Sequence, residues 1–296
     1  MAVDNCGVPL IESCRTESVN NEVLPMPLFE LPQTFEEWLP FMVPLVTLLI
    51  GLGYLLMPKM VLGRLGLEGG LNHPEGIGAG RSNFGGFMVG LSIVCILFQQ
   101  PVLNQALTLS WGIAALGKLV HLVLDGGLRQ KPAINLARLA VAAALAGYSY
   151  TQTGIPDGLK EFQFIIPESQ TVFLPWVAAA ITFLMGAVSF LVPSGMLVFM
   201  RMKTKVGSES AKGEPRGVLA GFYLGVSALL LMSPDVSAVP GLFMGFALGI
   251  CWIMSAFGRM ISMLSDRGNT LFNWFALILD LLLAALPFVV VLGLVK

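Results

Sequence analysis

The stretch RSNFGGFMVGLS, Arg81–Ser92, recurs 135 residues later as RGVLAGFYLGVS, Arg216–Ser227. Arginine, glycine, phenylalanine, glycine and serine keep their places in both copies. The match continues toward the N-terminus without a gap and pairs Pro58 with Pro193. Self-similarity at a fixed offset is the sequence signature of a duplicated structural unit. We therefore expect one helical unit to be present twice.

A second matched block carries charged residues at an offset of 141. Lys118 and Asp125 in the first copy correspond to Arg259 and Asp266 in the second. In both copies the base precedes the acid by seven residues, which places the two on one face of a helix. The duplication therefore includes ionisable residues as well as apolar ones.

The repeat divides the chain into a polar N-terminal arm, residues 1–37, and two membrane repeats, residues 38–150 and 171–296. The arm holds seven acidic residues against one arginine, together with four prolines. This composition is unlike that of a secretory signal or a transit peptide. Cys6 and Cys14 of the arm either form a disulfide or stay unpaired, because their spacing does not establish bridge geometry.

Composition places the protein in a membrane. Of 296 residues, 55% are hydrophobic and 12% are charged, with a mean hydropathy of +0.79, whereas soluble domains carry roughly a quarter charged residues. The net charge of −1 provides no basic surface for nucleic acid. Four cysteines without a CxxC pair, and two histidines, form no recognisable metal or haem motif. We therefore expect neither a metal nor another cofactor.

Eight segments are apolar and long enough to cross the hydrocarbon layer as helices. A break is expected at QQPVLNQ, residues 99–105, because proline and amides mark a turn. The fold predicted is an all-α integral membrane protein with eight transmembrane helices in two parallel four-helix repeats. The predicted spans are residues 38–58, 82–98, 106–124, 133–150, 172–192, 217–232, 237–258 and 270–295.

Lysine and arginine between the spans predict the orientation. Eleven lie in the segments after spans one, three, five and seven, Arg81 and Arg216 among them, against three on the other side. The positive-inside rule then places both termini on the non-cytoplasmic face. An even number of helices per repeat gives both copies the same orientation, related by a pseudo-two-fold axis along the membrane normal. A bacterial inner membrane or an organelle inner membrane is expected.

Glycines at matched positions predict close helix packing. Gly86 and Gly90 in the first copy correspond to Gly221 and Gly225 in the second, and the GxxxG spacing puts each pair on one helix face. We expect these glycines to pack within each four-helix unit. The alternative is that they form the interface between the copies or a groove for a partner helix.

Asp280 is the charged residue deepest in a predicted span. It lies about ten residues into the last helix, where a charge must be paired, protonated or turned toward a polar cavity. Arg259 on the preceding helix is its expected partner, either in a structural ion pair or in a proton, ion or ligand site. The first copy has Ala142 at the matching position, so we expect it to lack the polar site. Lys118 is expected to reach the membrane interface.

The motif residues resemble those of a known group of proteins. An arginine followed by Gly-Phe-x-x-Gly, and then a helix ending in G-[KR]-x6-D-x-G, resembles an uncharacterised family of bacterial four-helix membrane domains that is similar to the DoxX group. The resemblance covers both copies and implies a four-helix bundle, with a carboxylate on the last helix as at Asp280. Ala142 departs from that pattern. Fold resemblance does not imply an activity.

Two function classes follow from these features. The first, and preferred, is a non-catalytic structural or accessory subunit that packs against other membrane protein subunits and lipid. The alternative is a carrier or binding protein for a lipid, quinone or small solute, with Arg259 and Asp280 in its polar site. The sequence shows no catalytic constellation, so we do not expect an enzyme.

Overall fold

The computed structural model describes residues 33–38, 40–69, 73–125, 132–153, 167, 169–232 and 238–295. Nearly all of the predicted arm, including Cys6 and Cys14, lies outside the described residues. Residues Pro32–Lys296 form one compact unit by their contacts. The division of this unit at residues 38–150 and 171–296 stays a prediction.

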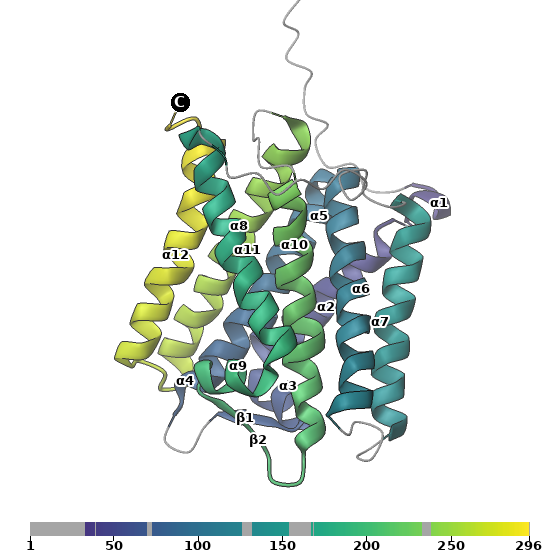
Figure 1. The fold of residues 1–296 in the computed structure, drawn as a ribbon, viewed down its shortest axis with the longest axis vertical. Coiled ribbons are helices and arrows are strands. Elements are labelled where there is room, and N and C mark those ends of the chain that lie inside the picture. The colour runs from purple at the N-terminus through teal and green to yellow at the C-terminus, as the bar shows by residue number, and fades with distance from the viewer. Residues whose placement is uncertain are drawn as a thin grey trace, which may run out of the picture. The chain divides into compact units, whose positions relative to one another are not determined.

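The described residues form helices and one pair of short strands (Figure 1). The helices are α1 (Phe35–Trp38), α2 (Met42–Leu56), α3 (Pro58–Leu65), α4 (Glu75–Ala79), α5 (Phe87–Phe98), α6 (Pro101–Leu124), α7 (Pro132–Thr153), α8 (Gln170–Leu191), α9 (Pro193–Phe199), α10 (Ala220–Met232), α11 (Val239–Ser265) and α12 (Leu271–Val291). Two π-helical segments, η1 (Gly80–Gly86) and η4 (Pro215–Leu219), a 3-10 turn η3 (Glu209–Lys212), and strands β1 (Leu67–Gly69) and β2 (Met202–Thr204) complete the description.

Among the described residues, six helical stretches are long and apolar enough to cross a membrane, and the chain is therefore a multi-pass α-helical membrane protein. They are Glu75–Phe98, Pro101–Leu124, Gln170–Leu191, Ser210–Met232, Val239–Ser265 and Leu271–Val291. A seventh results if α2 and α3, which meet at a bend of 104°, count as one span. Helix α7 is not among them, since its sequence carries Asn135, Arg138 and a polar last turn.

Two of the predicted spans begin too late. The helical stretches that hold the duplicated motif start at Glu75 and Ser210, about seven residues before the positions predicted. The predicted boundaries treated Arg81 and Arg216 as loop charges, but both side chains are buried. Lys212 also lies within the stretch that starts at Ser210. Removing these three residues leaves eight of the eleven basic residues counted toward orientation, against three, so the predicted direction is unchanged. Span three also begins earlier, because the helix starts at Pro101 directly after the turn.

Matched prolines end two of the membrane helices. Pro58 and Pro193 each occupy the first turn of a short helix, α3 or α9, directly after α2 or α8 ends. Proline cannot donate the backbone hydrogen bond that would continue the preceding helix, but it suits the first turn of a new one. The chain turns at both places, and Figure 1 shows α3, α4, α9, β1 and β2 together at one end of the bundle.

The two strands join regions that are far apart in sequence. They pair antiparallel, with Leu67 opposite Thr204, Glu68 opposite Lys203 and Gly69 opposite Met202. Glu68 and Lys203 stand 135 residues apart, so the strand pair is centred on two matching positions of the duplication. Their side chains form an ion pair at 3.3 Å.

The long helices pack in a crossed pattern. Helix α5 lies between α2 and α11, and α10 lies between α8 and α6. Helix α7 packs chiefly on α6, and α12 packs on α11 and α8. The helix that carries the duplicated motif in each half therefore packs against a helix of the other half.

The glycines of the motif make these crossed contacts. A Cβ atom at Gly86 would overlap the carbonyl oxygen of Met254 in α11, and one at Gly221 would overlap that of Ser110 in α6. At Gly90 a Cβ would lie 2.7 Å from the Cα of Cys251. The expectation that these glycines pack within each four-helix unit is wrong, and the alternative of an interface between the halves is correct. Only glycine allows backbones to approach this closely.

The interface between the halves is filled by aromatic rings. Phe87 of α5 lies 4.8 Å from the ring of Tyr223 in α10 and 5.5 Å from that of Trp252 in α11. Trp252 also donates a hydrogen bond from Nε1 to Thr182 Oγ1 at 3.0 Å. The matching pair in the first half, Trp111 and Thr47, makes the same bond at 2.9 Å. The core therefore repeats its polar contacts as well as its apolar ones.

Candidate functional site

The structure places Arg259 and Asp280 side by side, buried between α11 and α12. The Arg259 Nε donates to Asp280 Oδ2 at 2.9 Å, and both residues are at most 3% exposed. The remaining guanidinium nitrogens donate to Asn273 Oδ1 at 3.3 Å and Ser82 Oγ at 3.2 Å. All three nitrogens of Arg259 therefore have partners, as burial of the charge requires.

Two serines extend this cluster across the interface between the halves. Ser82 of η1 and Ser255 of α11 each donate to Asp280 Oδ2, at 3.3 and 3.4 Å, and their hydroxyl oxygens are 2.6 Å apart. Neither serine was predicted from the sequence to belong to the site. Their positions could have indicated it, because Ser82 follows the motif arginine and Ser255 precedes Arg259 by one helical turn.

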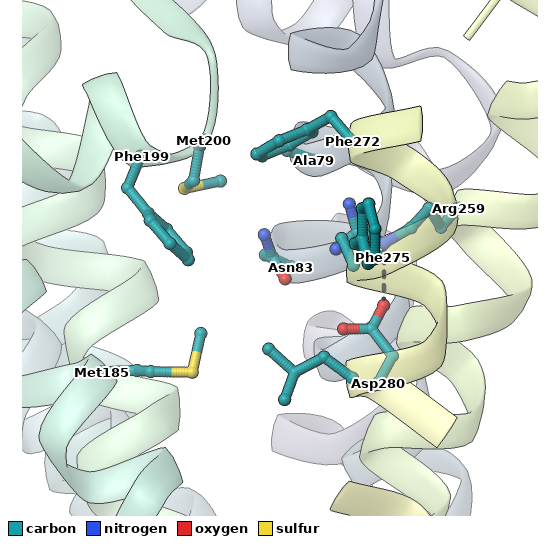
Figure 2. Close-up of a pocket in the computed structure, with 11 residues that line it drawn as sticks. Ala79, Asn83, Met185, Phe199, Met200, Arg259, Phe272, Phe275 and Asp280 are labelled. Atoms are coloured by element: carbon teal, nitrogen blue, oxygen red, sulfur yellow. Dashed lines mark hydrogen bonds and ion pairs between the residues drawn. The ribbon is translucent and has the colours of Figure 1, made fainter. Parts of the chain in front are cut away.

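A cavity of about 200 Å³ adjoins this cluster. The residues that line it come from α4, η1, α8, α9, α11 and α12, together with Met200 directly after α9. Figure 2 shows Met185, Phe199 and Met200 on one side, facing Asp280 and Phe275 on the other. The remaining lining residues are Ala79, Asn83, Arg259, Phe272, Ala276 and Leu279. An apolar cavity with a few polar groups on one side is the usual form of a small-molecule site.

Two polar groups beside this cavity are not engaged by the hydrogen bonds of the cluster described above. In Figure 2 the second carboxylate oxygen of Asp280, the one not bonded to Arg259, points toward the cavity. Asn83 accepts a hydrogen bond from the Tyr223 hydroxyl through its amide oxygen, at 3.0 Å, which leaves its NH2 group directed away from that bond. The cavity therefore offers a hydrogen-bond acceptor and a donor.

The first half, which has Ala142 at the position of Asp280, also contributes to a buried cluster of charged residues. Lys118 of α6 forms an ion pair at 2.6 Å with Glu214, which precedes η4 in the other half. Arg138 of α7 contacts the same Glu214 oxygen at 3.3 Å. The carboxylate on the last helix, absent at Ala142, is thus supplied from a different helix. Glu214 was missed because it lies in a segment that resembled a charged loop.

Crossed ion pairs link the two motif arginines to the opposite half. Arg81 contacts Asp266 at 2.8 Å, and Arg216 contacts Asp125 at 2.9 Å. Burial raises the pKa of the Asp266 carboxyl, but hydrogen bonds from Lys59 and Arg81 outweigh burial and hold that pKa below its ordinary value. The arginine that begins each repeat motif therefore forms a salt bridge to the other half.

His121 lies beside one of these pairs. Its Nδ1 is 3.0 Å from Asp125 Oδ2, while its buried Nε2 has no hydrogen-bond partner among the described residues. Within the described residues no three His, Cys, Asp or Glu side chains are grouped as a metal site would require.

Comparisons with protein-family models, with curated proteins and with solved structures found no match to this chain. The site must therefore be interpreted from its own geometry.

Proposed function

We propose that the protein binds an apolar small molecule with a hydrogen-bonding head group, of the lipid or quinone class, in the cavity beside Arg259 and Asp280. The observation that carries this proposal is the cavity itself: apolar and aromatic walls enclose one buried ion pair. This is the alternative derived from the sequence, and it is now preferred over the accessory-subunit function.

The cavity suits a ligand that enters from the lipid. Phe275 and Phe199, which line it from α12 and α9, are 72% and 56% exposed on helices of a membrane-spanning bundle. A ligand that slides between them remains in an apolar environment throughout its path. Entry would remove no charged group from water. The free energy needed to remove a charge from water is the large cost for a polar solute that enters a membrane.

The polar wall selects the head group. The cluster of Arg259 and Asp280 is neutral overall, so neither an anion nor a cation is favoured there. Asp280 offers an acceptor and Asn83 a donor, which together complement a hydroxyl group. We therefore infer a neutral amphiphile that carries a hydroxyl, such as a neutral lipid or the quinol form of a quinone. The role of the protein in this proposal is binding or transfer, without catalysis.

A blocking substitution tests the proposal. Ala276 lines the cavity, so Ala276→Trp should fill it and abolish co-purification of the bound molecule, which mass spectrometry of organic extracts identifies. Ala137→Trp, on the exposed face of α7, adds the same side chain elsewhere and should retain the molecule. Equal ligand content in both variants would reject the cavity as the binding site.

A structural or accessory role remains the second candidate, supported by the outer face of α7. Its small residues, spaced three or four apart, are exposed, and a Cβ at Gly147 would meet nothing within 4 Å. Such a stripe permits close approach of another helix. The residues of the stripe are Ala133, Ala137, Ala140, Ala144 and Gly147.

We also propose that the bundle comprises eight spans, as two parallel four-helix repeats of the family that resembles the DoxX group. The crossed glycine contacts, the crossed ion pairs and the centred strand pair are reciprocal, which supports a two-fold relation between the halves. The spans beyond the six that qualify by composition would be α2 with α3, and α7.

Labelling from one side of the membrane checks the topology. A cysteine introduced at the fully exposed Val206, between β2 and η3, should react from the cytoplasmic side. Cys6 should react from the opposite side if the protein crosses the membrane eight times with both termini outside. Buried Cys95 and Cys251 should not interfere. Reaction of both labelled positions from the same side would exclude this topology.

A further inference from the structure

The cluster of Lys118, Arg138 and Glu214 carries one more positive than negative charge. Lys118 and Glu214 already neutralise each other at 2.6 Å, and Arg138 approaches the same carboxylate at 3.3 Å. The matching cluster in the second half has no third charge, because Ala276 stands where the first half has Arg138. Among the described residues on the α7 side, a buried base, Lys118, and a partly exposed base, Arg138, thus share one acid.

The position of this extra charge matches the level of lipid head groups. Lys118 lies six residues from the end of α6, and Arg138 lies six residues from the start of α7. At 1.5 Å per residue both are about 9 Å from the same end of the bundle. By the distribution of basic residues this end faces the cytoplasm.

Arg138 is also the accessible member of the cluster. Its side chain is 25% exposed, against 7% for Lys118 and 4% for Glu214. Helix α7, which carries it, packs along α6 and makes only slight contact with α2. Arg138 is therefore a partly exposed base whose charge is not fully balanced by the acid of the cluster.

We propose that the exposed part of this cluster binds the phosphate head group of an anionic lipid of the cytoplasmic leaflet, with Arg138 as its main contact. An arginine recognises phosphate with two parallel hydrogen bonds. Basic pockets between transmembrane helices on the cytoplasmic side are a recurrent form of lipid head-group site. The phosphate neutralises the excess charge of the cluster. This site is separate from the cavity between α8 and α12 and does not depend on the function proposed there.

Native mass spectrometry of the full-length protein in detergent, titrated with phosphatidylglycerol, phosphatidylcholine or inorganic phosphate, tests the proposal. The parent protein should retain one phosphatidylglycerol in preference to phosphatidylcholine. Arg138→Ala should weaken this binding by about ten-fold or more, as expected for loss of hydrogen bonds to a charged group, and Arg138→Lys should restore part of it. Lys203→Ala removes a partly exposed charge at the same end of the bundle and should change the binding little.

Three results would overturn the proposal. The first is equal binding of phosphatidylglycerol and phosphatidylcholine to the parent protein. This result needs no variant, so it holds even if Arg138→Ala does not fold. An equal loss in Arg138→Ala and Lys203→Ala would show that only overall charge matters. Displacement of the lipid by inorganic phosphate at the same concentration would show that the site is built for a free anion.

Discussion

Replacement of Asp280 by alanine should lower the free energy of unfolding by about 3–5 kcal/mol, because it leaves a buried charge without its partner. The substitution removes the acceptor for Arg259 and for two serine hydroxyls at once. Ser82 and Asn273 still accept from the guanidinium, but neither carries a negative charge.

The double replacement of Arg259 and Asp280 by leucine and methionine should be much milder, since no charge remains buried. Reversible unfolding of the purified protein in mixed detergent measures the free energies for a double-mutant cycle. Glu68→Ala, which breaks a half-exposed ion pair, provides the comparison and should cost about 1 kcal/mol or less. An Asp280→Ala variant as stable as the parent would contradict the assigned role of the pair. The ligand content of the double variant is then compared with that of the parent. A folded double variant that has lost the ligand indicates a binding role for the pair, and one that retains the ligand indicates a structural role.

Alanine at both Gly86 and Gly221 should destabilise the bundle by about 2–6 kcal/mol, taking the usual cost of overpacking at each of two separate sites. A Cβ at Gly86 would lie 2.7 Å from the Cα of Ser255, and one at Gly221 would lie 2.8 Å from the backbone nitrogen of Ala114. These are backbone atoms, which cannot turn aside as a flexible side chain would. The helices must separate, and the contacts between the halves weaken together.

Two other helical glycines provide matched controls for this experiment. A Cβ at Gly112 of α6 or at Gly147 of α7 would meet nothing within 4 Å. Alanine at either position should leave stability unchanged or raise it by about 1 kcal/mol, because alanine favours the helix. The same unfolding measurement serves all three variants. A loss at Gly112 or Gly147 comparable to that of the double variant would show that the close approach of backbones is not the cause.

The division into two repeats stays a prediction, whereas the sequence was sufficient to predict the membrane class and the adjacency of Arg259 and Asp280. The last of these followed from depth alone: two consecutive antiparallel helices bring residues at similar distances from their shared turn to the same level. The prediction did not require knowledge of how the other helices pack. It could be made because both residues belong to one half of the chain.

Contacts that cross between the halves could not be predicted in the same way. A motif such as Gly86 and Gly90 shows that a helix face is closely packed, but not which helix packs on it. Glu214 was missed for a related reason. It follows the basic, serine-rich segment at 201–212, and only its three-dimensional position next to Lys118 distinguishes it from a loop residue. The starts of the spans at Glu75 and Ser210 were obscured by the charges of Arg81 and Arg216, which are neutralised by distant acids.

The crossed salt bridges impose an order of events on biosynthesis. Arg81 and its acceptor Asp266 are 185 residues apart, so at 5–20 residues per second the arginine is made roughly 10–40 s before the aspartate. During that interval Arg81 has no acidic partner, and the helix face that carries Gly86 and Gly90 has no partner helix. Asp125, in turn, precedes Arg216 by 91 residues. The first half therefore cannot reach its final packing until the ribosome has nearly finished the second.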